Sequence, residues 1–403
     1  MEQHKDILLV NPNYWSDVFG ENTHLPCGLG FIARVLELNG NTYDIIDLNF
    51  QQIGEIFNLL NRHKPPYLGI SMMSYRVEQS YELLNRVKAT FPDITIIVGG
   101  PHVIASKQNL LTECPAVDIA CIGEGEETII EILNGKQMLA NIQGIYYRAT
   151  TGVEMTAPRP FTKKLDHIPF PTYNGFQLDK YQNKMLLASS RGCPYKCTFC
   201  GAPTFLGKKW RRRSAQGMVE ELLYWYERGY REFVFEDSLF SADKKRIHNF
   251  CDQMIELNIP ISIDVEGARA DHMNYELLKH MKQAKFQTLV FGVESANNHV
   301  LQAYKKGETI EQIENTVKIA NQLGFQIGMF FIIGGPGETV QDVEHSFELA
   351  QKYENVAFAY FFKLTPVPGT PYFEYAVEAG YVNEAKKYPT GNFGFEGVAF
   401  IGN

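Results

Sequence analysis

The chain has 403 residues, of which 45% are hydrophobic and 21% charged, and its formal net charge is −8. This length exceeds one average domain and predicts two domains with room for a sizeable hydrophobic interior. The acidic balance argues against a protein that grips the phosphate backbone of nucleic acids, and the longest apolar stretch, residues 327–333, is far short of the roughly 20 residues that cross a bilayer.

The first third of the chain alternates short strand patterns with helical ones. DILLV at residues 6–10 is followed by a segment at 29–40 whose apolar positions recur at helical spacing and which ends on Gly40. Four more strand patterns follow, at 42–48, 67–71, 94–100 and 117–123. This alternation predicts an amino-terminal doubly wound parallel sheet, a Rossmann-like domain over residues 1–140.

The loops after these strands are where such a sheet binds ligands. They read NPNYW, SMMS, GGPH and GEGE, and none matches G-x-G-x-x-G, so the dinucleotide fingerprint is absent. Glycine at a strand end permits the backbone to approach a bulky ligand closely. The alternative is that these glycines only make turns.

Residues 141–180 are rich in Pro, Thr and Gly, and we expect a linker there with an edge strand at 145–147. A second series of strand patterns follows, at 184–190, 232–236, 261–265, 287–294, 326–334 and 356–364, with helical patterns such as 215–228 and 310–323 between them. Six βα units predict a partial (β/α)6 barrel over 181–385, with its active site at the carboxyl ends of the strands. Residues 386–403 form a short tail.

Three of the seven cysteines, Cys193, Cys197 and Cys200, come directly after the strand expected at 184–190. An odd and uneven count favours a reducing compartment with a metal site over a disulfide framework. Three thiolates are one ligand short of a closed structural zinc site, which His248 or Cys251 would complete only if folding brought them close. An iron–sulfur cluster on three thiolates instead keeps one iron open for an outside ligand.

The spacing C-x3-C-x2-C after a strand resembles the signature of the radical S-adenosylmethionine (SAM) superfamily. This resemblance implies that the three cysteines hold a [4Fe-4S] cluster whose open iron chelates the amino and carboxylate groups of SAM. The segments FEDSLF, EGARAD, FGVES, IIGGPGET and PVPGTPYF resemble the family's elements at successive strand ends, the first in a version without the common Gly-Gly-Glu. The SAM-binding residues that the resemblance implies are Phe199, Glu236, Asp237, Ser238, Arg269, Glu294, Ser295 and Gly335.

The carboxylates at the strand ends, and one further segment, also have plainer interpretations. A carboxylate such as Glu294 or Glu338 is usually a surface or capping group, and only the coincidence at successive strand ends favours SAM binding. The segment GKKWRRRS at 207–214 has five cations around Trp210 and would suit phosphate. Because it leads into a helix with Ser214 as a plausible cap, we prefer a structural or substrate-carboxylate role over nucleic acid.

The amino-terminal segments NPNYW, LPCGLGFIARVLELNG, VGGPHV and DIACIGEGEET resemble the cobalamin-binding domain that is fused to one large radical SAM subgroup. The pocket residues implied are Asn13, Ser71, Gly99, Gly100, His102, Glu124 and Gly125. The D-x-H-x-x-G motif that supplies a histidine to cobalt is missing, so cobalt would lack a protein imidazole. His102 is equally compatible with a loop histidine packed against the following helix.

The resemblance implies an enzyme that splits SAM into methionine and a 5′-deoxyadenosyl radical, which removes hydrogen from an unactivated carbon, and methylcobalamin then delivers a methyl group. We expect methylation of a small natural-product or lipid-type substrate; the sequence ranks no general acid or base. One alternative is a non-methylating radical SAM enzyme that cyclises, rearranges or oxidises its substrate, and another is a non-catalytic cobalamin or redox sensor. Products would separate them, since methylation yields S-adenosylhomocysteine beside 5′-deoxyadenosine.

The expected partners follow from this chemistry. They are a small-molecule substrate and an electron donor such as flavodoxin or ferredoxin, with no nucleic acid. The chain starts without a basic leader and apolar signal core, so we expect a cytoplasmic protein.

Overall fold

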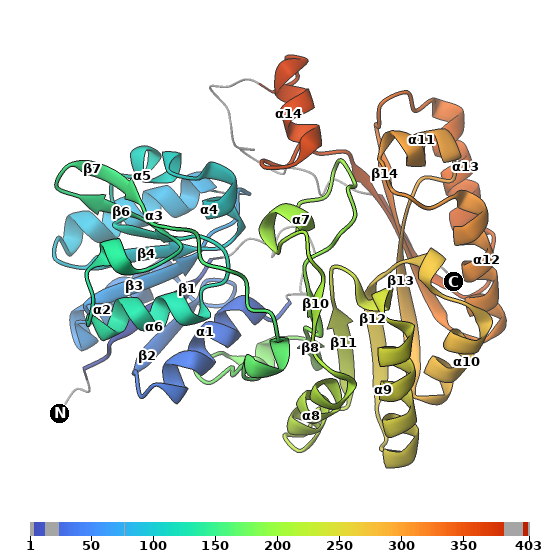
Figure 1. Cartoon of the computed structure of the whole chain (residues 1–403), viewed down its shortest axis with the longest axis horizontal. Helices are drawn as coiled ribbons and strands as arrows, with labels where there is room; N and C mark the ends of the chain where they lie inside the picture. Colours follow the sequence, from blue (N-terminus) through green and yellow to red (C-terminus); the bar gives the residue numbers. More distant parts are fainter. Residues whose placement is uncertain (1–3, 13–23, 76, 383–397, 402–403) are drawn as a thin grey trace. The chain divides into compact units, whose positions relative to one another are not determined.

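The computed structural model describes residues 4–12, 24–75, 77–382 and 398–401. The chain divides into two compact units, the first built mainly from the residues before Lys163 and the second mainly from Asn183–Tyr375. Each unit contains one seven-stranded sheet (Figure 1).

The first unit is the doubly wound sheet that the alternating pattern predicts, with strand order β2-β1-β3-β4-β5-β6-β7. Its parallel strands are β1 (Ile7–Asn11), β2 (Tyr43–Asp47), β3 (Tyr67–Ser71), β4 (Thr95–Gly99) and β5 (Ile119–Cys121). Its helices are α1 (Cys27–Leu38), α2 (Ile53–His63), α3 (Val77–Thr90), α4 (Pro101–Ser106), α5 (Asn109–Glu113) and α6 (Glu126–Asn134). The core is apolar because the strands are buried on both faces, with β1 fully buried along its length.

An antiparallel hairpin extends this sheet beyond the predicted edge strand. It consists of β6 (Ile145–Ala149) and β7 (Gly152–Met155), and β6 pairs with β5. The segment expected as a linker therefore begins with two strands of the first sheet.

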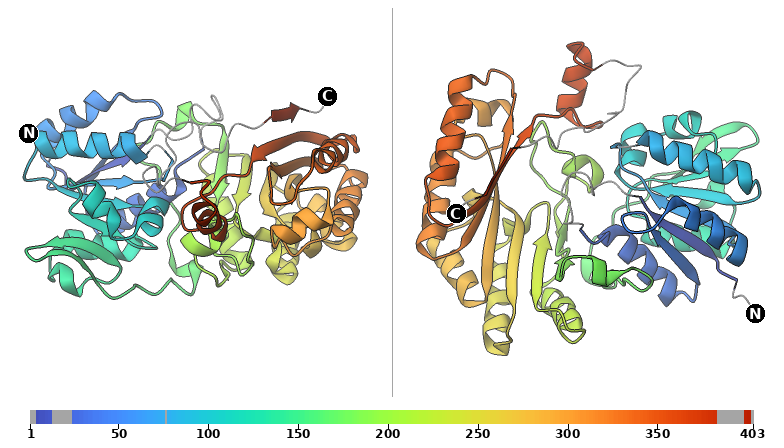
Figure 2. Two further views of the ribbon diagram at one scale, coloured as in Figure 1. Left: turned by 90° about the horizontal axis from the view of Figure 1, so that it is seen from above. Right: turned by 180° about the vertical axis from the view of Figure 1, so that it is seen from behind.

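The second unit is the predicted partial barrel. Six parallel strands lie in chain order in one sheet: β8 (Lys184–Leu187), β11 (Glu232–Glu236), β12 (Ser262–Ala268), β13 (Phe286–Glu294), β14 (Gln326–Ile333) and β15 (Val356–Lys363). The connecting helices are α8 (Ala215–Tyr226), α9 (Lys244–Leu257), α10 (Tyr275–Gln283), α12 (Ile310–Gln322) and α13 (Val340–Gln351). Figure 2 shows from further directions that helices α9, α10, α12 and α13 lie along the outer side of this curved sheet.

Shorter elements complete the second unit at the strand ends. They are the two-residue strands β9 (Ser190–Arg191) and β10 (Arg211–Arg212), and the helices α7 (Ala202–Phe205), α11 (Asn298–Ala303) and α14 (Pro371–Glu378). The tail contributes β16 (Val398–Ile401), which pairs antiparallel with β15. Between sheet and helices the core is aromatic; the Phe235 ring lies 5.1 Å from that of Phe240 and 5.6 Å from that of Phe250.

Candidate active site

The three clustered cysteines lie on one loop, residues 192–200, at the carboxyl end of the first barrel strand. Gly192 begins this loop with φ +86°, and a Cβ there would lie 2.4 Å from the carbonyl oxygen of Lys209 and 2.8 Å from that of Gly207. Only glycine fits, because the conformation is left-handed and the space is already filled by backbone. The amide of Cys193 donates to the Gly207 carbonyl at 3.0 Å, which fixes the entry to the loop.

The cysteine thiols share one electrostatic environment. Burial raises the pKa of all three, to about 11 for Cys197, and the positive charge of Lys306 opposes this shift at each of them. The charge of Cys200 further raises the pKa of Cys197, and that of Cys193 raises the pKa of Cys200. Buried thiols that affect one another and lie near a cation suit a bound metal, whose charge deprotonates them.

The donor set fits an iron–sulfur cluster better than a single ion. Among the residues that the structure describes, no three His, Cys, Asp or Glu side chains converge closely enough to share one metal ion. A cluster does not require this, because each thiolate binds a different iron. The candidates for completing a zinc site are engaged elsewhere: Nδ1 of His248 lies 2.7 Å from Nδ1 of His280, and Cys251 is fully buried on the inner face of α9.

The segment Tyr304–Glu308, which we call the brace, holds the cysteine loop against the barrel. The amide of Thr198 donates to the Tyr304 carbonyl at 2.9 Å, and its hydroxyl reaches the same oxygen at 3.4 Å. The Phe199 ring packs edge-on against that of Tyr304, with centroids 5.4 Å apart. Phe199, one of the predicted SAM-binding residues, is therefore supported by a segment that sequence reasoning did not identify.

Glu294 ends β13 in a strained conformation. Its φ is +65°, and the register between β13 and β14 shifts at this point. The ammonium of Lys306 lies 3.0 Å from the Glu294 carboxylate and 3.5 Å from that of Glu308. Burial alone would lower the pKa of Lys306, but these carboxylates raise it, so the lysine stays charged. A non-glycine residue in this region of φ is held there by its surroundings and commonly marks a functional site.

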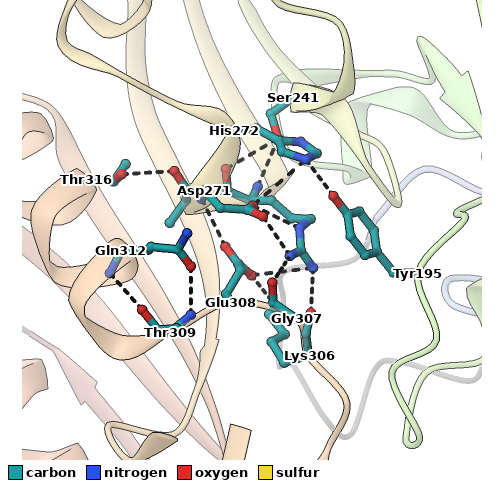
Figure 3. Close-up of polar contacts among 12 residues, drawn as sticks. Tyr195, Ser241, Asp271, His272, Lys306, Gly307, Glu308, Thr309, Gln312 and Thr316 are labelled. Carbon is teal, nitrogen blue, oxygen red and sulfur yellow. Dashed lines mark hydrogen bonds and ion pairs between the residues drawn. The ribbon is translucent and has the colours of Figure 1, made fainter. Parts of the chain in front are cut away.

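Arg269 follows β12 and belongs to a dense polar network, whose members Asp271 and Lys306 are labelled in Figure 3. Its guanidinium makes two hydrogen bonds of 3.0 Å to the carboxylate of Asp271 and donates to the carbonyl of Lys306 at 2.9 Å. The guanidinium carbon lies 3.6 Å from the centroid of the Tyr195 ring, which belongs to the cysteine loop. The network thus joins the cysteine loop, the end of β12 and the brace.

The residues at the end of β11 differ in their surroundings. The buried Asp237 carboxylate accepts from the amides of Ser189 and Ser190 at 2.7 and 2.9 Å, so it tethers the strand that leads into the cysteine loop. Glu236 and Ser238, on either side of it, are exposed. These two side chains are the ones in FEDSLF that remain accessible to a ligand.

The loop after β14 is closely packed. A Cβ on Gly335 would lie 2.3 Å from the Tyr304 hydroxyl, so this glycine permits the brace to approach. Glu338 accepts hydrogen bonds from the amides of Gly334 and Gly335 at 2.5 and 3.1 Å, which is the capping role that the plainer interpretation gives it. Ser295 is buried and its hydroxyl accepts from the amide of Asn297 at 3.3 Å.

The arginines of the segment GKKWRRRS make contacts within the second unit. Arg213 is 2% exposed, pairs with Glu221 at 3.3 Å and donates to the Leu165 carbonyl at 2.8 Å. Arg211 donates to the carbonyl of Leu206, and Arg212 pairs with Asp243 at 3.1 Å. Ser214 caps α8 by accepting from the Gly217 amide. These contacts agree with a structural role for the segment.

In the first unit, the predicted cobalamin residues that the structure describes lie at the carboxyl ends of parallel strands or just beyond. Gly100 follows β4 with φ +94°, and a Cβ there would lie 2.7 Å from the Met72 carbonyl, so this glycine lets the ends of β3 and β4 meet. Ser71 and Gly99 end those two strands. Glu124 accepts from the Thr162 amide at 2.8 Å, and Gly125 begins α6. Asn13 lies outside the described residues.

His102 is fully buried, and both of its ring nitrogens are engaged. Nδ1 lies 3.0 Å from the Ser74 hydroxyl and Nε2 lies 2.8 Å from that of Tyr81. The Tyr81 hydroxyl also lies 3.1 Å from the Glu113 carboxylate, and the direction of its hydrogen bond with His102 depends on the tautomer of the ring. Burial lowers the pKa of His102 to about 4, which keeps the ring neutral.

Comparison with known proteins assigns a domain type to each unit. Residues 187–350 match the family model described as the radical SAM superfamily, and residues 20–133 match the B12 binding domain. The second match covers the strand ends that carry Ser71, Gly100 and His102, and the first covers the cysteine loop, the network and the brace. No described helix is both long and apolar enough to cross a membrane.

Relatives extend over most of the chain. An uncharacterized methyltransferase of Pyrococcus horikoshii is 32% identical over 92% of this chain and 83% of its own length. An anaerobic magnesium-protoporphyrin IX monomethyl ester cyclase of Rubrivivax gelatinosus is 26% identical, over 95% of this chain and 72% of its own length. The solved structure of the radical SAM methyltransferase TsrM of Kitasatospora setae, with cobalamin and a [4Fe-4S] cluster bound, superposes with a TM-score of 0.79 at 17% identity, covering 94% of this chain and 75% of that one. That similarity shows a shared fold.

Proposed function

The chain belongs to the radical SAM superfamily and carries a B12-binding domain, and from this premise we propose that it methylates an unactivated carbon of a small natural-product or lipid-type molecule. It is a cobalamin-dependent radical SAM enzyme of the methyltransferase-like kind, with a [4Fe-4S] cluster, SAM and cobalamin as cofactors. The observation that supports the proposal most is the loop of three cysteines, one buried and two half-buried, at the carboxyl end of a barrel strand, in a chain that also has a B12-binding domain.

When bound, the cluster supplies the electron that cleaves SAM, and methylcobalamin supplies the methyl group. We propose that Cys193, Cys197 and Cys200 hold the cluster and that Phe199 lies against the adenine. In the same proposal the carboxylate of Glu294, whose backbone is strained, binds the SAM ribose. The ion pair with Lys306 fixes the position of this carboxylate. The accessible Glu236 and Ser238 would contact the SAM amino group.

The first unit would bind cobalamin at its strand ends, where an added Cβ on Gly99 would meet nothing within 4 Å, so the end of β4 leaves room for a bulky ligand. We propose that His102 supports this surface and does not bind cobalt. The support is that the ring is fully buried and that both of its nitrogens lie within hydrogen-bond distance of hydroxyl groups of the protein. Cobalt would then lack an imidazole from the protein.

A second candidate is a radical reaction without methyl transfer. The cyclase relative covers 95% of this chain, so the same architecture is found in proteins named for ring formation. In that case SAM cleavage would be the only shared step. The Pyrococcus horikoshii and Rubrivivax gelatinosus relatives are named as a methyltransferase and a cyclase, which favours catalysis over a sensor.

The proposal includes the source of electrons and the compartment. We propose a flavodoxin or ferredoxin as the donor, because each transfers single electrons at low potential. We also propose a cytoplasmic location, since seven free cysteines, including an oxygen-sensitive cluster site, suit a reducing compartment.

The products identify the reaction. The protein would be loaded anaerobically with iron and sulfide, titrated with hydroxocobalamin while its absorbance is followed, and then given SAM, a reductant and candidate substrates. Methylation predicts S-adenosylhomocysteine together with 5′-deoxyadenosine, and no S-adenosylhomocysteine when cobalamin is omitted. If cobalamin is present and the substrate is consumed, formation of 5′-deoxyadenosine without S-adenosylhomocysteine would refute methylation and support the second candidate.

A further inference from the structure

Tyr195 stands between two of the cluster cysteines and is held from two sides. The Arg269 guanidinium covers its ring, with the carbon 3.6 Å from the ring centroid. Its hydroxyl lies 2.6 Å from Nε2 of His272, as Figure 3 shows. Both groups come from the chain just after β12, so the middle of the cysteine loop is attached to a different strand end of the barrel.

Protein acceptors lie within reach of all three nitrogens of the Arg269 guanidinium. Asp271 accepts from Nε and Nη2, and the carbonyls of Lys306 and Gly307 accept from Nη1 and Nη2 at 2.9 and 3.4 Å. The Glu308 carboxylate adds an ion pair with Nη1 at 3.5 Å. Arginine has five N–H donors in a rigid fork, and the protein accepts four hydrogen bonds from this fork.

Arg269 and His272 belong to the segment 269–272, which we call the platform, and hydrogen bonds hold this segment in place. The Asp271 amide donates to Glu308 at 3.1 Å, the Thr316 hydroxyl of α12 donates to the Ala270 carbonyl at 2.9 Å, and Ser241 lies 3.4 Å from Nδ1 of His272 (Figure 3). Arg269 is only 7% exposed. Buried and hydrogen-bonded on several sides, the platform can impose a position on the ring that it touches.

The cysteine loop needs such support. Residues 193–200 form no helix or strand, yet their three thiols must be spaced to match three corners of one cluster. Ligands of this kind depend on partners that orient them. Arg269 over the Tyr195 ring supplies a cation–π contact at one side of the loop, and Tyr304 of the brace binds Thr198 at the other.

We propose that Tyr195 is a positioning residue through which the Arg269 network sets the cysteine loop for the cluster, and that Arg269 acts on the cofactors through this ring and not as a ligand of the SAM carboxylate. The resemblance to relatives alone would make Arg269 a SAM contact. This inference goes beyond methylation and rests only on the cluster site, so it stands or falls independently of the methyl-transfer proposal.

The first test replaces Tyr195. Tyr195→Leu removes both contacts and Tyr195→Phe removes only the hydroxyl contact to His272. Tyr226→Leu is the matched control, because Arg231 covers the Tyr226 ring at 3.9 Å on the distant helix α8. The readouts are the rate at which a chelator strips iron from the loaded protein and the hydrogen exchange of peptides spanning 193–200 in the metal-free protein.

We expect Tyr195→Leu to lose iron about tenfold faster or more and to exchange faster in these peptides. Tyr195→Phe should fall between that variant and the unmodified protein, and Tyr226→Leu should match the unmodified protein. Iron loss and exchange at unmodified rates in Tyr195→Leu would overturn the proposal. If that variant does not fold, judged by circular dichroism, the Tyr195→Phe exchange result decides in the same way.

The second test separates the two roles of Arg269. Arg269→Lys keeps the charge but loses the fork, so we expect faster iron loss and an unchanged dissociation constant for SAM in the cluster-loaded fraction. Normal iron retention with weakened SAM binding would make Arg269 a direct SAM ligand and overturn its assignment as a positioning residue.

Discussion

Gly192 is the residue whose backbone most directly shapes the cysteine loop. We predict that Gly192→Ala destabilises the second unit and lowers the iron bound per chain, because its Cβ would lie 2.4 Å from the Lys209 carbonyl in a left-handed conformation. Gly229→Ala is the matched control. Gly229 has φ +100°, but an added Cβ would meet nothing within 4 Å, so this substitution causes only the backbone strain, about 1 kcal/mol. Melting temperature and iron content measure both, and equal effects of the two substitutions would contradict the steric argument.

His102 makes the stability of the first unit depend on pH. Its pKa is lowered by burial to about 4, below its ordinary value of about 6.5, so the unfolded chain binds a proton at higher pH than the folded one. The resulting stabilisation is complete above pH 6.5, is lost as pH falls from 6.5 to 4, and amounts to about 3 kcal/mol.

The measurement is urea unfolding of the first unit, followed by hydrogen exchange of its peptides at several pH values. The free energy of unfolding of the native unit should rise with pH between pH 4 and 6.5. In His102→Gln the part of this slope that comes from His102 should disappear, while cobalamin binding at neutral pH is retained. An unchanged slope would show that His102 does not remain neutral in the folded unit.

At the residue scale, sequence spacing was enough to find the three cysteines because they lie within eight positions of one another. The contacts of Tyr195 could not be predicted in this way. Arg269 and His272 are more than 70 positions further along the chain, and Lys306 is further still. Only the barrel brings them together, and the segment YKKGE has the local pattern of an ordinary turn after a helix.

Helix α8 is attached to the segment before it by the buried ion pair of Arg213 and Glu221, each 2% exposed. We predict that Arg213→Met destabilises the second unit by about 3–5 kcal/mol, because it leaves the Glu221 carboxylate buried without its partner. The double variant Arg213→Met/Glu221→Leu should be much less destabilised, since it removes both charges. Thermal unfolding of the three proteins measures this.

Equal destabilisation of the single and double variants would contradict the ion-pair explanation. The same variants bear on the nucleic-acid interpretation of GKKWRRRS. An arginine that is 2% exposed contributes to folding and has little surface to offer a phosphate.

At the scale of elements, the predicted strand positions agree with the observed ones where an apolar run is bounded by turn residues. The helix expected at 310–323 is α12 (Ile310–Gln322), which Thr309 and Gln312 start with a capping box. The β6–β7 hairpin was predicted only as a single edge strand, because β7 reads GVEM and is largely exposed, so it lacks an apolar run. Strand β16 joins β15 by antiparallel pairing, and pairing of the tail with a particular strand is not encoded in a local pattern.

For the whole molecule, alternation of strands and helices predicted both units, since crossover connections require a parallel sheet. The family signature then linked the second unit to SAM chemistry and the first to cobalamin, and both matches agree with this division. The substrate could not be predicted, because the motifs found in the sequence are those of the family and carry no signal for a particular substrate.

The central claim is that three cysteines hold a four-iron cluster with one iron left for SAM, and Mössbauer spectroscopy of the protein loaded anaerobically with ⁵⁷Fe tests it most directly. We predict a [4Fe-4S] spectrum in which the parameters of one iron in four change when SAM is added, and no such spectrum in Cys197→Ala. A spectrum that SAM leaves unchanged, or a purified protein that holds zinc at this loop in place of iron, would contradict the account.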